Sequence, residues 1–309
     1  MDLVLWRTFT IIFSVEFIIG TLGNGFIVLM KCTDWIKGSK LSFVDQILIG
    51  LAISRTGLIW LIFLDWWLFM LYPILHMTEK MLRMYYISWT VLNHLNLWLT
   101  ASLSIFYFLK IANFYKTIFL YLKFRVKKVI AVTLLVSLLI LILNIIIIKI
   151  YVDMCIVGAQ RNVSYTSSMN NYEQSCKLLA FTNPMFTLIP FGMSLTTLLL
   201  LIFSLWKHLK NTQHSMKDSR DISSKAHIKA LQTVIVSVLL YSIFFLSFFM
   251  KVWGKSWKDK YFFSLCAWAL GIAVLSGHSF VLIQGNNRLR WAWRSVMLWF
   301  RCRFKSAEP

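Results

Sequence analysis

Charged residues are scarce in this chain: they make up 14% of its 309 residues, whereas hydrophobic residues make up 59%. A soluble domain of this length cannot bury so much apolar surface, so the composition predicts a protein that crosses the membrane several times. Acidic residues are scarcer still, 12 against 32 Lys and Arg. The basic residues fall mainly between apolar segments, as is typical of membrane proteins, and nucleic-acid binding is therefore not expected.

The sequence also lacks enzyme and metal-site motifs. Neither HExxH nor GxSxG occurs, and the carboxylates of Glu16 and Asp65 have no positioned nucleophile, so we expect no hydrolase. These two carboxylates either meet a ligand amine or face water. The 5 cysteines form no CxxC pair and have no histidine spacing typical of zinc ligands, so no metal or cofactor is expected.

Seven apolar segments are long enough to cross a bilayer, which takes roughly 20 residues of helix. They predict an all-α membrane protein, a seven-transmembrane helix bundle forming one domain over residues 1–309. The expected spans are residues 9–30, 45–70, 84–111, 129–150, 182–206, 230–252 and 260–284. The first span is too long for a cleavable signal peptide and is interpreted as a signal anchor.

The distribution of Lys and Arg predicts the orientation of the bundle. Segments 31–44, 110–128, 207–229 and 285–309 together carry 21 of these residues, and the segments on the other side carry 10. The more basic side is expected to be cytoplasmic, with the N-terminus outside and the C-terminus inside. The N-x-S/T sequon at Asn162 then lies in the longest exterior loop, where glycosylation is chemically accessible.

The tail, residues 285–309, is expected to be cytoplasmic and to contain a short amphipathic helix. Between residues 286 and 304 it alternates Arg with Trp, Leu and Phe at helical spacing. One basic and one aromatic face suit a helix that lies along the inner leaflet. Cys302 in this setting is either palmitoylated or a free thiol.

Polar groups at membrane depth are costly and are functional candidates by default. Arg55 lies about ten residues into the second span, at roughly 15 Å from the inner face. Asn24 in the first span and His278 and Ser279 in the seventh lie in the same inner layer. We expect Asn24 and Ser279 to satisfy the buried guanidinium, in a polar layer that acts as a structural clamp, a switch, or both.

A second group of residues predicts a ligand pocket. Trp89 and Asn93 are four residues apart in the third span and share a helix face. We expect them to line an outward-opening cavity for flat, amphipathic small molecules, although packing or lipid contact is the alternative for each aromatic residue. The other residues expected around this cavity are Trp66, His94, Phe186, Tyr241, Phe244, Phe248 and Trp268.

Over nearly its whole length the chain resembles the bitter taste receptors, the type 2 taste receptor family of G-protein-coupled receptors. The runs FYFLKIANF (106–114) and HSFVLIQGNNRLR (278–290) are specific to that family, and LAISR (51–55) also matches. The D-R-Y and N-P-x-x-Y motifs of rhodopsin-like receptors are absent. The loop disulfide usual in rhodopsin-like receptors cannot form here, because no cysteine lies at the start of the third span. Whether Cys155 and Cys176 form a disulfide is left open by the sequence.

The resemblance implies a plasma-membrane receptor, not an enzyme, that binds bitter small-molecule agonists. It further implies activation of a heterotrimeric G protein of the gustducin type, leading to phospholipase C and calcium release. By resemblance, Tyr107 and Lys110 lie at the inner end of the third span, on the G-protein side. Lys110 is equally suited to anchor that end among membrane lipids.

Two other classes of membrane protein remain as alternatives. A vomeronasal-type pheromone receptor also has seven spans, but the two family-specific runs argue against it. A multi-pass transporter or enzyme should show repeated halves or a catalytic constellation, and the sequence has neither. The sequence leaves the identity of the agonist and the oligomeric state open.

Overall fold

The computed structural model describes residues 3–71, 78–112, 114, 117–161, 169–215, 222–253 and 260–305. These residues contain no strand and fold into nine α-helices. The helices are α1 (Leu3–Ile36), α2 (Phe43–Leu71), α3 (Glu79–Ile111), α4 (Thr117–Phe124), α5 (Val126–Arg161), α6 (Met169–Ser215), α7 (Ile222–Trp253), α8 (Lys260–Gly285) and α9 (Asn287–Lys305).

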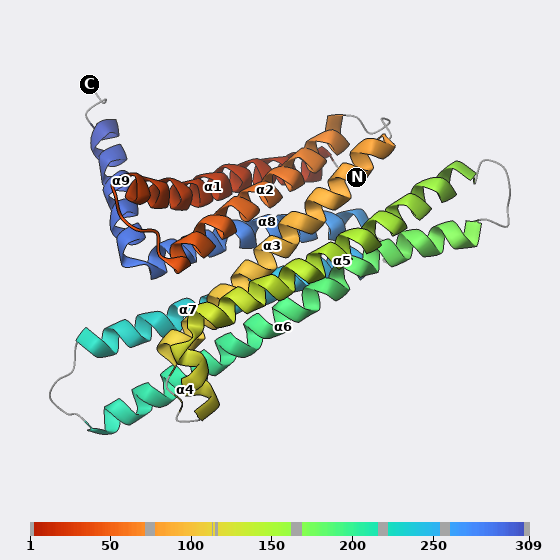
Figure 1. Ribbon diagram of the computed structural model, residues 1–309. Coiled ribbons are helices and arrows are strands. Elements are labelled where there is room, and N and C mark those ends of the chain that lie inside the picture. Colours follow the sequence, from red (N-terminus) through yellow and green to blue (C-terminus); the bar gives the residue numbers. More distant parts are fainter. Residues whose placement is uncertain are drawn as a thin grey trace.

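The seven long helices α1, α2, α3, α5, α6, α7 and α8 run alongside one another and form the bundle (Figure 1). Helix α3 packs against α2, α5 and α6, while α8 packs against α1, α2 and α7. This arrangement confirms the prediction of an all-α seven-helix bundle. We call the end of the bundle that carries the described residues 31–44, 110–112, 117–128, 207–215, 222–229 and 285–305 the basic end.

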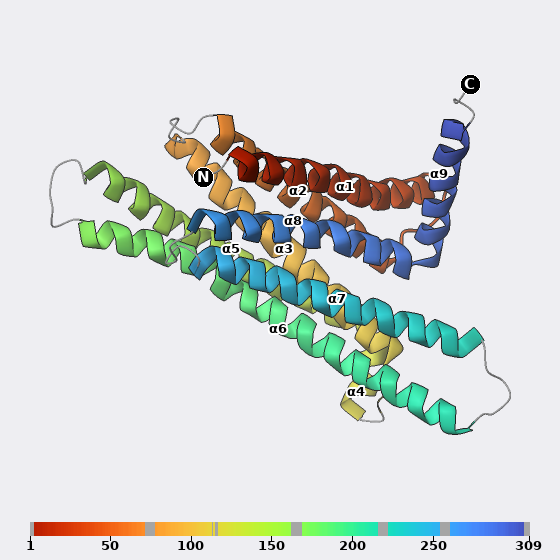
Figure 2. The ribbon, with the colours of Figure 1, turned by 180° about the vertical axis from the view of Figure 1, so that it is seen from behind.

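Helix α9 begins where α8 stops and turns across the axis of the bundle (Figures 1 and 2). Asn286 caps the N-terminus of α9, because its side-chain oxygen accepts hydrogen bonds from the backbone N–H groups of Arg288 and Leu289 at 3.0 and 3.3 Å. The side chain of Trp293 packs on Phe26 and Phe280, while Trp291 is exposed. The amphipathic helix predicted in the tail is therefore present.

Two of the predicted loops are largely helical. Helix α5 continues to Arg161 and α6 begins at Met169, so most of the expected loop 151–181 belongs to these helices. In the same way α6 continues to Ser215 and shortens the expected loop 207–229. An apolar run reports the thickness of the hydrocarbon layer, whereas a helix ends only where its backbone hydrogen bonding stops.

Helices α1, α2, α5, α6 and α8 each contain a segment that is long and apolar enough to cross a membrane, and α7 has a shorter apolar stretch. Helix α3 is more polar, because Asn93, His94 and Asn96 lie in its middle. These polar side chains are buried inside the bundle. Large apolar side chains of α5, such as Leu135, Leu139 and Ile142, are exposed and suit contact with lipid.

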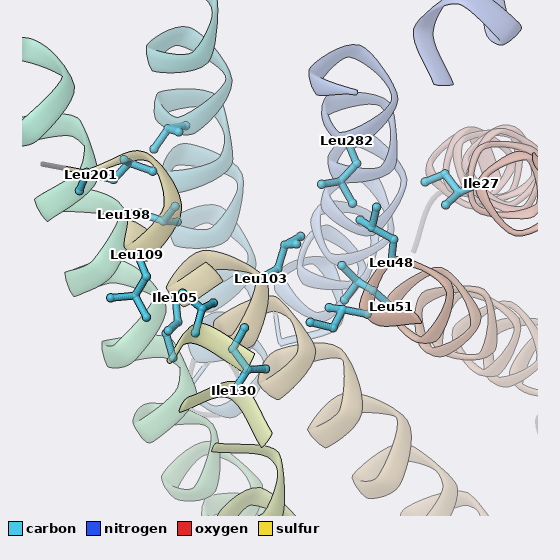
Figure 3. Packing of buried hydrophobic residues seen from close by; sticks show 14 of the residues in the cluster. Ile27, Leu48, Leu51, Leu103, Ile105, Leu109, Ile130, Leu198, Leu201 and Leu282 are labelled. Atoms are coloured by element: carbon cyan, nitrogen blue, oxygen red, sulfur yellow. The ribbon is translucent and has the colours of Figure 1, made fainter. Parts of the chain in front are cut away.

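The largest group of buried apolar side chains lies in the half of the bundle next to the basic end. Leu51 of α2, Leu103 of α3, Ile130 of α5, Leu201 of α6 and Leu282 of α8 all belong to it (Figure 3). Lipid is as apolar as these side chains, so close packing and interhelical hydrogen bonds hold the helices together. The polar residues between the helices are therefore central to the fold.

Candidate functional site

Arg55 of α2 is almost completely buried, with 3% of its surface exposed, and binds helix α3. Its Nε donates a hydrogen bond to Oδ1 of Asn96 at 3.1 Å, and its Nη2 donates to Oγ1 of Thr100 at 3.4 Å. Among the described residues Nη1 has no hydrogen-bond partner. A buried charge needs such partners, so this contact fixes α2 against α3.

Asn24 and Ser279 form a separate contact between α1 and α8. The hydroxyl of Ser279 donates to Oδ1 of Asn24 at 2.6 Å, and Nδ2 of Asn24 donates to the carbonyl oxygen of Gly20 at 2.9 Å. The predicted pairing of Arg55 with these two residues is therefore wrong. The reason is that Asn24 and Ser279 satisfy each other, whereas the guanidinium points toward α3.

An inner cavity of about 280 Å³ lies between α3, α6, α7 and α8, next to the Arg55 contact. Tyr107, Tyr241 and His278, all predicted site residues, line it together with Thr100, which also binds Arg55. The cavity follows α3 from Thr100 to Ile111, about 16 Å along the helix axis.

The walls of the inner cavity are mainly apolar, with hydroxyl groups at intervals. Leu103, Leu198 and Leu282 supply apolar surface, and Thr233 and Ser237 supply hydroxyls. The cavity reaches Gly285 and Asn287, where α8 gives way to α9. A concave, largely apolar site with a few polar groups suits a small amphipathic molecule.

The predicted outer pocket is divided in the structure. Trp89, Phe244 and Trp268 line a cavity of about 30 Å³, in which the ring centres of Trp89 and Trp268 are 6.2 Å apart. Asn93 and His94 line a different cavity of about 10 Å³, together with Phe186. Cavities for drug-sized ligands measure roughly 300–1,000 Å³, so both of these are closed to such ligands in this conformation.

Trp89 and Asn93 therefore face different cavities, although they are four residues apart on one helix. Helix α3 packs against α2 on one side and against α5 and α6 on another. The indole of Trp89 lies toward α8, whereas Asn93 is among residues of α5 and α6. One face of a central helix is thus shared between two sets of neighbours, and the prediction of one common pocket is wrong here.

The remaining predicted pocket residues make further contacts with neighbouring helices or lie outside the described side chains. Trp66 packs against Trp6 and Phe13, with ring centres 5.0 and 4.7 Å apart. Nε2 of His94 lies 2.9 Å from the carbonyl oxygen of Ser137 and thereby binds α5. The side chains of Phe248, Cys155 and Cys176 and the whole of Asn162 lie outside the described part of the chain.

Sequence reasoning missed Thr100 and gave Asn96 no role. The signal was present, because Asn96 and Thr100 are four residues apart and so lie on one face of α3. Thr100 Oγ1 also donates to the backbone carbonyl oxygen of Asn96 at 2.7 Å, which fixes the Thr100 hydroxyl on this face of α3. The inner cavity has no comparable signal in the sequence, because residues from five helices, α3 and α6 to α9, form it.

Comparisons with known proteins all find one receptor family. The model of the family described as taste receptor protein (TAS2R) matches residues 1–301. The chain is 62% identical to taste receptor type 2 member 113 of Rattus norvegicus over 308 residues, covering 100% of both chains. It is 51% identical to taste receptor type 2 member 14 of Macaca mulatta over 309 residues, covering 100% of this chain and 97% of the relative. For taste receptor type 2 member 14 of Homo sapiens the identity is 50% over 301 residues, covering 97% of this chain and 94% of the relative.

Proposed function

Since the chain belongs to the taste receptor type 2 (TAS2R) family of seven-transmembrane receptors, we propose that it binds bitter small molecules within the bundle and activates a heterotrimeric G protein. The G protein is of the gustducin type and acts through phospholipase C and calcium release. The receptor works in the plasma membrane, with its basic end toward the cytoplasm.

The aromatic cluster of Trp89, Phe244 and Trp268 is the proposed agonist contact. The observation that carries this proposal is that three helices, α3, α7 and α8, each contribute one of these rings to the same cavity. Flat aromatic faces offer large apolar area to a flat ligand. Because the cavity is closed in this conformation, agonist must favour a state in which α7 or α8 has moved outward.

Helix α7 supplies the link from this cluster to the G-protein side. Phe244 lines the outer cavity, and Tyr241, one helical turn away, lines the inner cavity beside Arg55. Residues three apart on a helix move together, so a displacement of α7 at Phe244 also changes the inner cavity at Tyr241. Tyr107 lines the same cavity and lies four residues before the end of α3, where we propose that the G protein binds.

The inner cavity is a second candidate site for the agonist. Its volume of about 280 Å³ is close to that of small-molecule sites, and the hydroxyl of Ser237 can orient a polar group of the ligand. The two candidate sites differ in which substitutions reduce agonist potency.

A calcium-release assay tests the proposed function. Cells that express the chain together with a chimeric G protein are exposed to a panel of bitter compounds, and cells without the G protein serve as the control. We expect at least one compound to raise calcium in a concentration-dependent manner only when both proteins are present. Silence across a broad panel, with receptor demonstrated at the cell surface, overturns the proposal.

A further inference from the structure

We propose that a further cavity, at the basic end, binds the headgroup of an anionic phospholipid that carries additional phosphate groups. This basic cavity has a volume of about 500 Å³ and lies between the start of α2, the end of α3 and the junction of α4 and α5. It is separate from the inner cavity, because the two share none of the described lining residues. The proposal does not depend on which agonist the receptor binds.

Cationic side chains from several elements converge on the basic cavity. Lys110 comes from the end of α3, Lys123 from α4, Arg125 from the junction, and Lys127 and Lys128 from the start of α5. Among the residues that the structure describes, no Asp or Glu lines the cavity. Five cations without a lining carboxylate exceed what one phosphate diester requires, so the charge matches a headgroup with several phosphates.

The carboxylate beside the basic cavity is already neutralised. Asp45 accepts hydrogen bonds from the backbone N–H and the hydroxyl of Ser42, a lining residue, at 3.1 and 2.7 Å. It also forms an ion pair with the buried side chain of Lys31. Asp45 therefore leaves Lys110, Lys127 and Lys128 uncompensated, and the part of the chain that the structure describes contains no ion pair to these three.

Two of the five cations are held in place by the fold. The guanidinium of Arg125 stacks on the ring of Tyr121, 4.5 Å from its centre, and Nη1 donates to the Tyr121 hydroxyl at 2.7 Å. Nζ of Lys123 donates to the carbonyl oxygen of Ala112 at 3.0 Å. Ordering these side chains before binding lowers the entropy cost of engaging an anion.

The surroundings favour an amphiphile over a dissolved anion. Phe43, Val44 and Phe106 give the basic cavity apolar walls. Phe124 also lines it and is 87% exposed, and Ile118 of α4 is exposed as well. Apolar side chains exposed beside a cluster of cations suit the boundary between headgroups and acyl chains. We therefore commit to a lipid whose phosphates meet the cations while its chains follow the apolar surface of α4.

The test measures lipid binding to purified full-length receptor in nanodiscs of neutral phospholipid. A fluorescent inositol phospholipid with two phosphates on its ring is the probe. The variant Arg125→Gln/Lys128→Gln removes two charges from the basic cavity, and the matched control Arg294→Gln/Arg301→Gln removes two exposed charges from α9. The single variant Lys127→Gln, at an exposed position, serves as a second cavity variant if the first does not fold.

We expect the cavity double variant to weaken probe binding at least about tenfold and the α9 variant to leave it within about twofold, because only the first removes direct phosphate contacts. Phosphatidylserine and the soluble inositol phosphate headgroup should compete much less well than the unlabelled lipid. Equal losses in the two double variants would mean diffuse attraction to the membrane and overturn the site. Equal competition by the soluble headgroup would mean a soluble-anion site and overturn the lipid assignment.

Discussion

Arg55 on α2 and Asn96 on α3 are joined within the membrane-spanning part of the bundle by a hydrogen bond of 3.1 Å from Nε to Oδ1. Thr100, one turn further along α3, accepts a second bond from the same guanidinium. Both partners belong to the helix that also lines the outer and inner cavities. The orientation of α3 relative to α2 therefore depends on a polar contact, and changes there should affect folding and signalling together.

We predict that Arg55→Ala and Asn96→Ala each lower the stability of the receptor by about 1–3 kcal/mol, since each leaves a buried polar group without its partner. The double variant should lose less than the sum, because both single changes remove the same bond. Thermal unfolding of purified receptor and surface expression are the measurements. Ile53→Ala, at a 55% exposed position on the same helix, is the control. Strict additivity, or stability equal to that of the control, would show that the bond contributes little.

Gly20 offers a test of helix packing. A Cβ atom there would collide with Oγ of Ser276 on α8 and lie 2.7 Å from Cδ1 of Ile59 on α2. We therefore expect Gly20→Ala to destabilise the receptor by about 1–3 kcal/mol, as overpacking does. Gly25→Ala on the same helix is the matched control, because no atom of the described residues lies within 4 Å of a Cβ atom there. Similar melting temperatures for both variants would contradict the close approach of α1 to α8.

Agonist potency distinguishes the two candidate ligand sites. We expect Trp89→Ala to raise the effective agonist concentration at least about tenfold, equal to roughly 1.4 kcal/mol of lost binding. Trp60→Ala, on the exposed surface of α2, is the control. Concentration–response curves for two chemically unrelated agonists, at matched surface expression, are the measurement.

Filling the inner cavity gives the complementary arm of this experiment. Ser237→Phe places a ring in that cavity, whereas Ser242→Phe places one on the exposed surface of α7. The two serines are otherwise alike, since each donates to the carbonyl oxygen four residues earlier at 2.9 Å. If Ser237→Phe reduces potency for both agonists while Trp89→Ala does not, the agonist binds in the inner cavity and the outer assignment is wrong.

The orientation of the chain stays a prediction that glycosylation can test. With 21 basic residues on one side and 10 on the other, Asn162 is expected outside and should carry one glycan. Glycosidase treatment should increase the gel mobility of the expressed protein and leave Asn162→Gln unchanged. A wild-type protein that does not respond to glycosidase, although it reaches the cell surface, would count against an exterior position of this loop.

The class of protein could be predicted from the sequence, because apolar length and charge bias act locally. Seven apolar segments predicted the seven-helix bundle, and the Arg and Trp alternation after residue 286 predicted α9. The lengths of the helices could not be predicted from the apolar segments, because α5 and α6 continue past them. The short helix α4 was not predicted, because its residues lie within the segment 110–128, which was treated as a basic connection between two spans.

The sequence alone predicts that Arg55, Asn24, Asn93 and Ser279 lie at membrane depth, because chain position gives their distance from the ends of the predicted spans. Which of them meet was decided only by the tertiary structure. The rotation of each helix about its own axis turns Arg55 toward Asn96 and leaves Asn24 with Ser279. The rotation of α3 also directs Trp89 and Asn93 into different cavities. These rotations arise from side-chain packing among all seven long helices, which no single segment encodes.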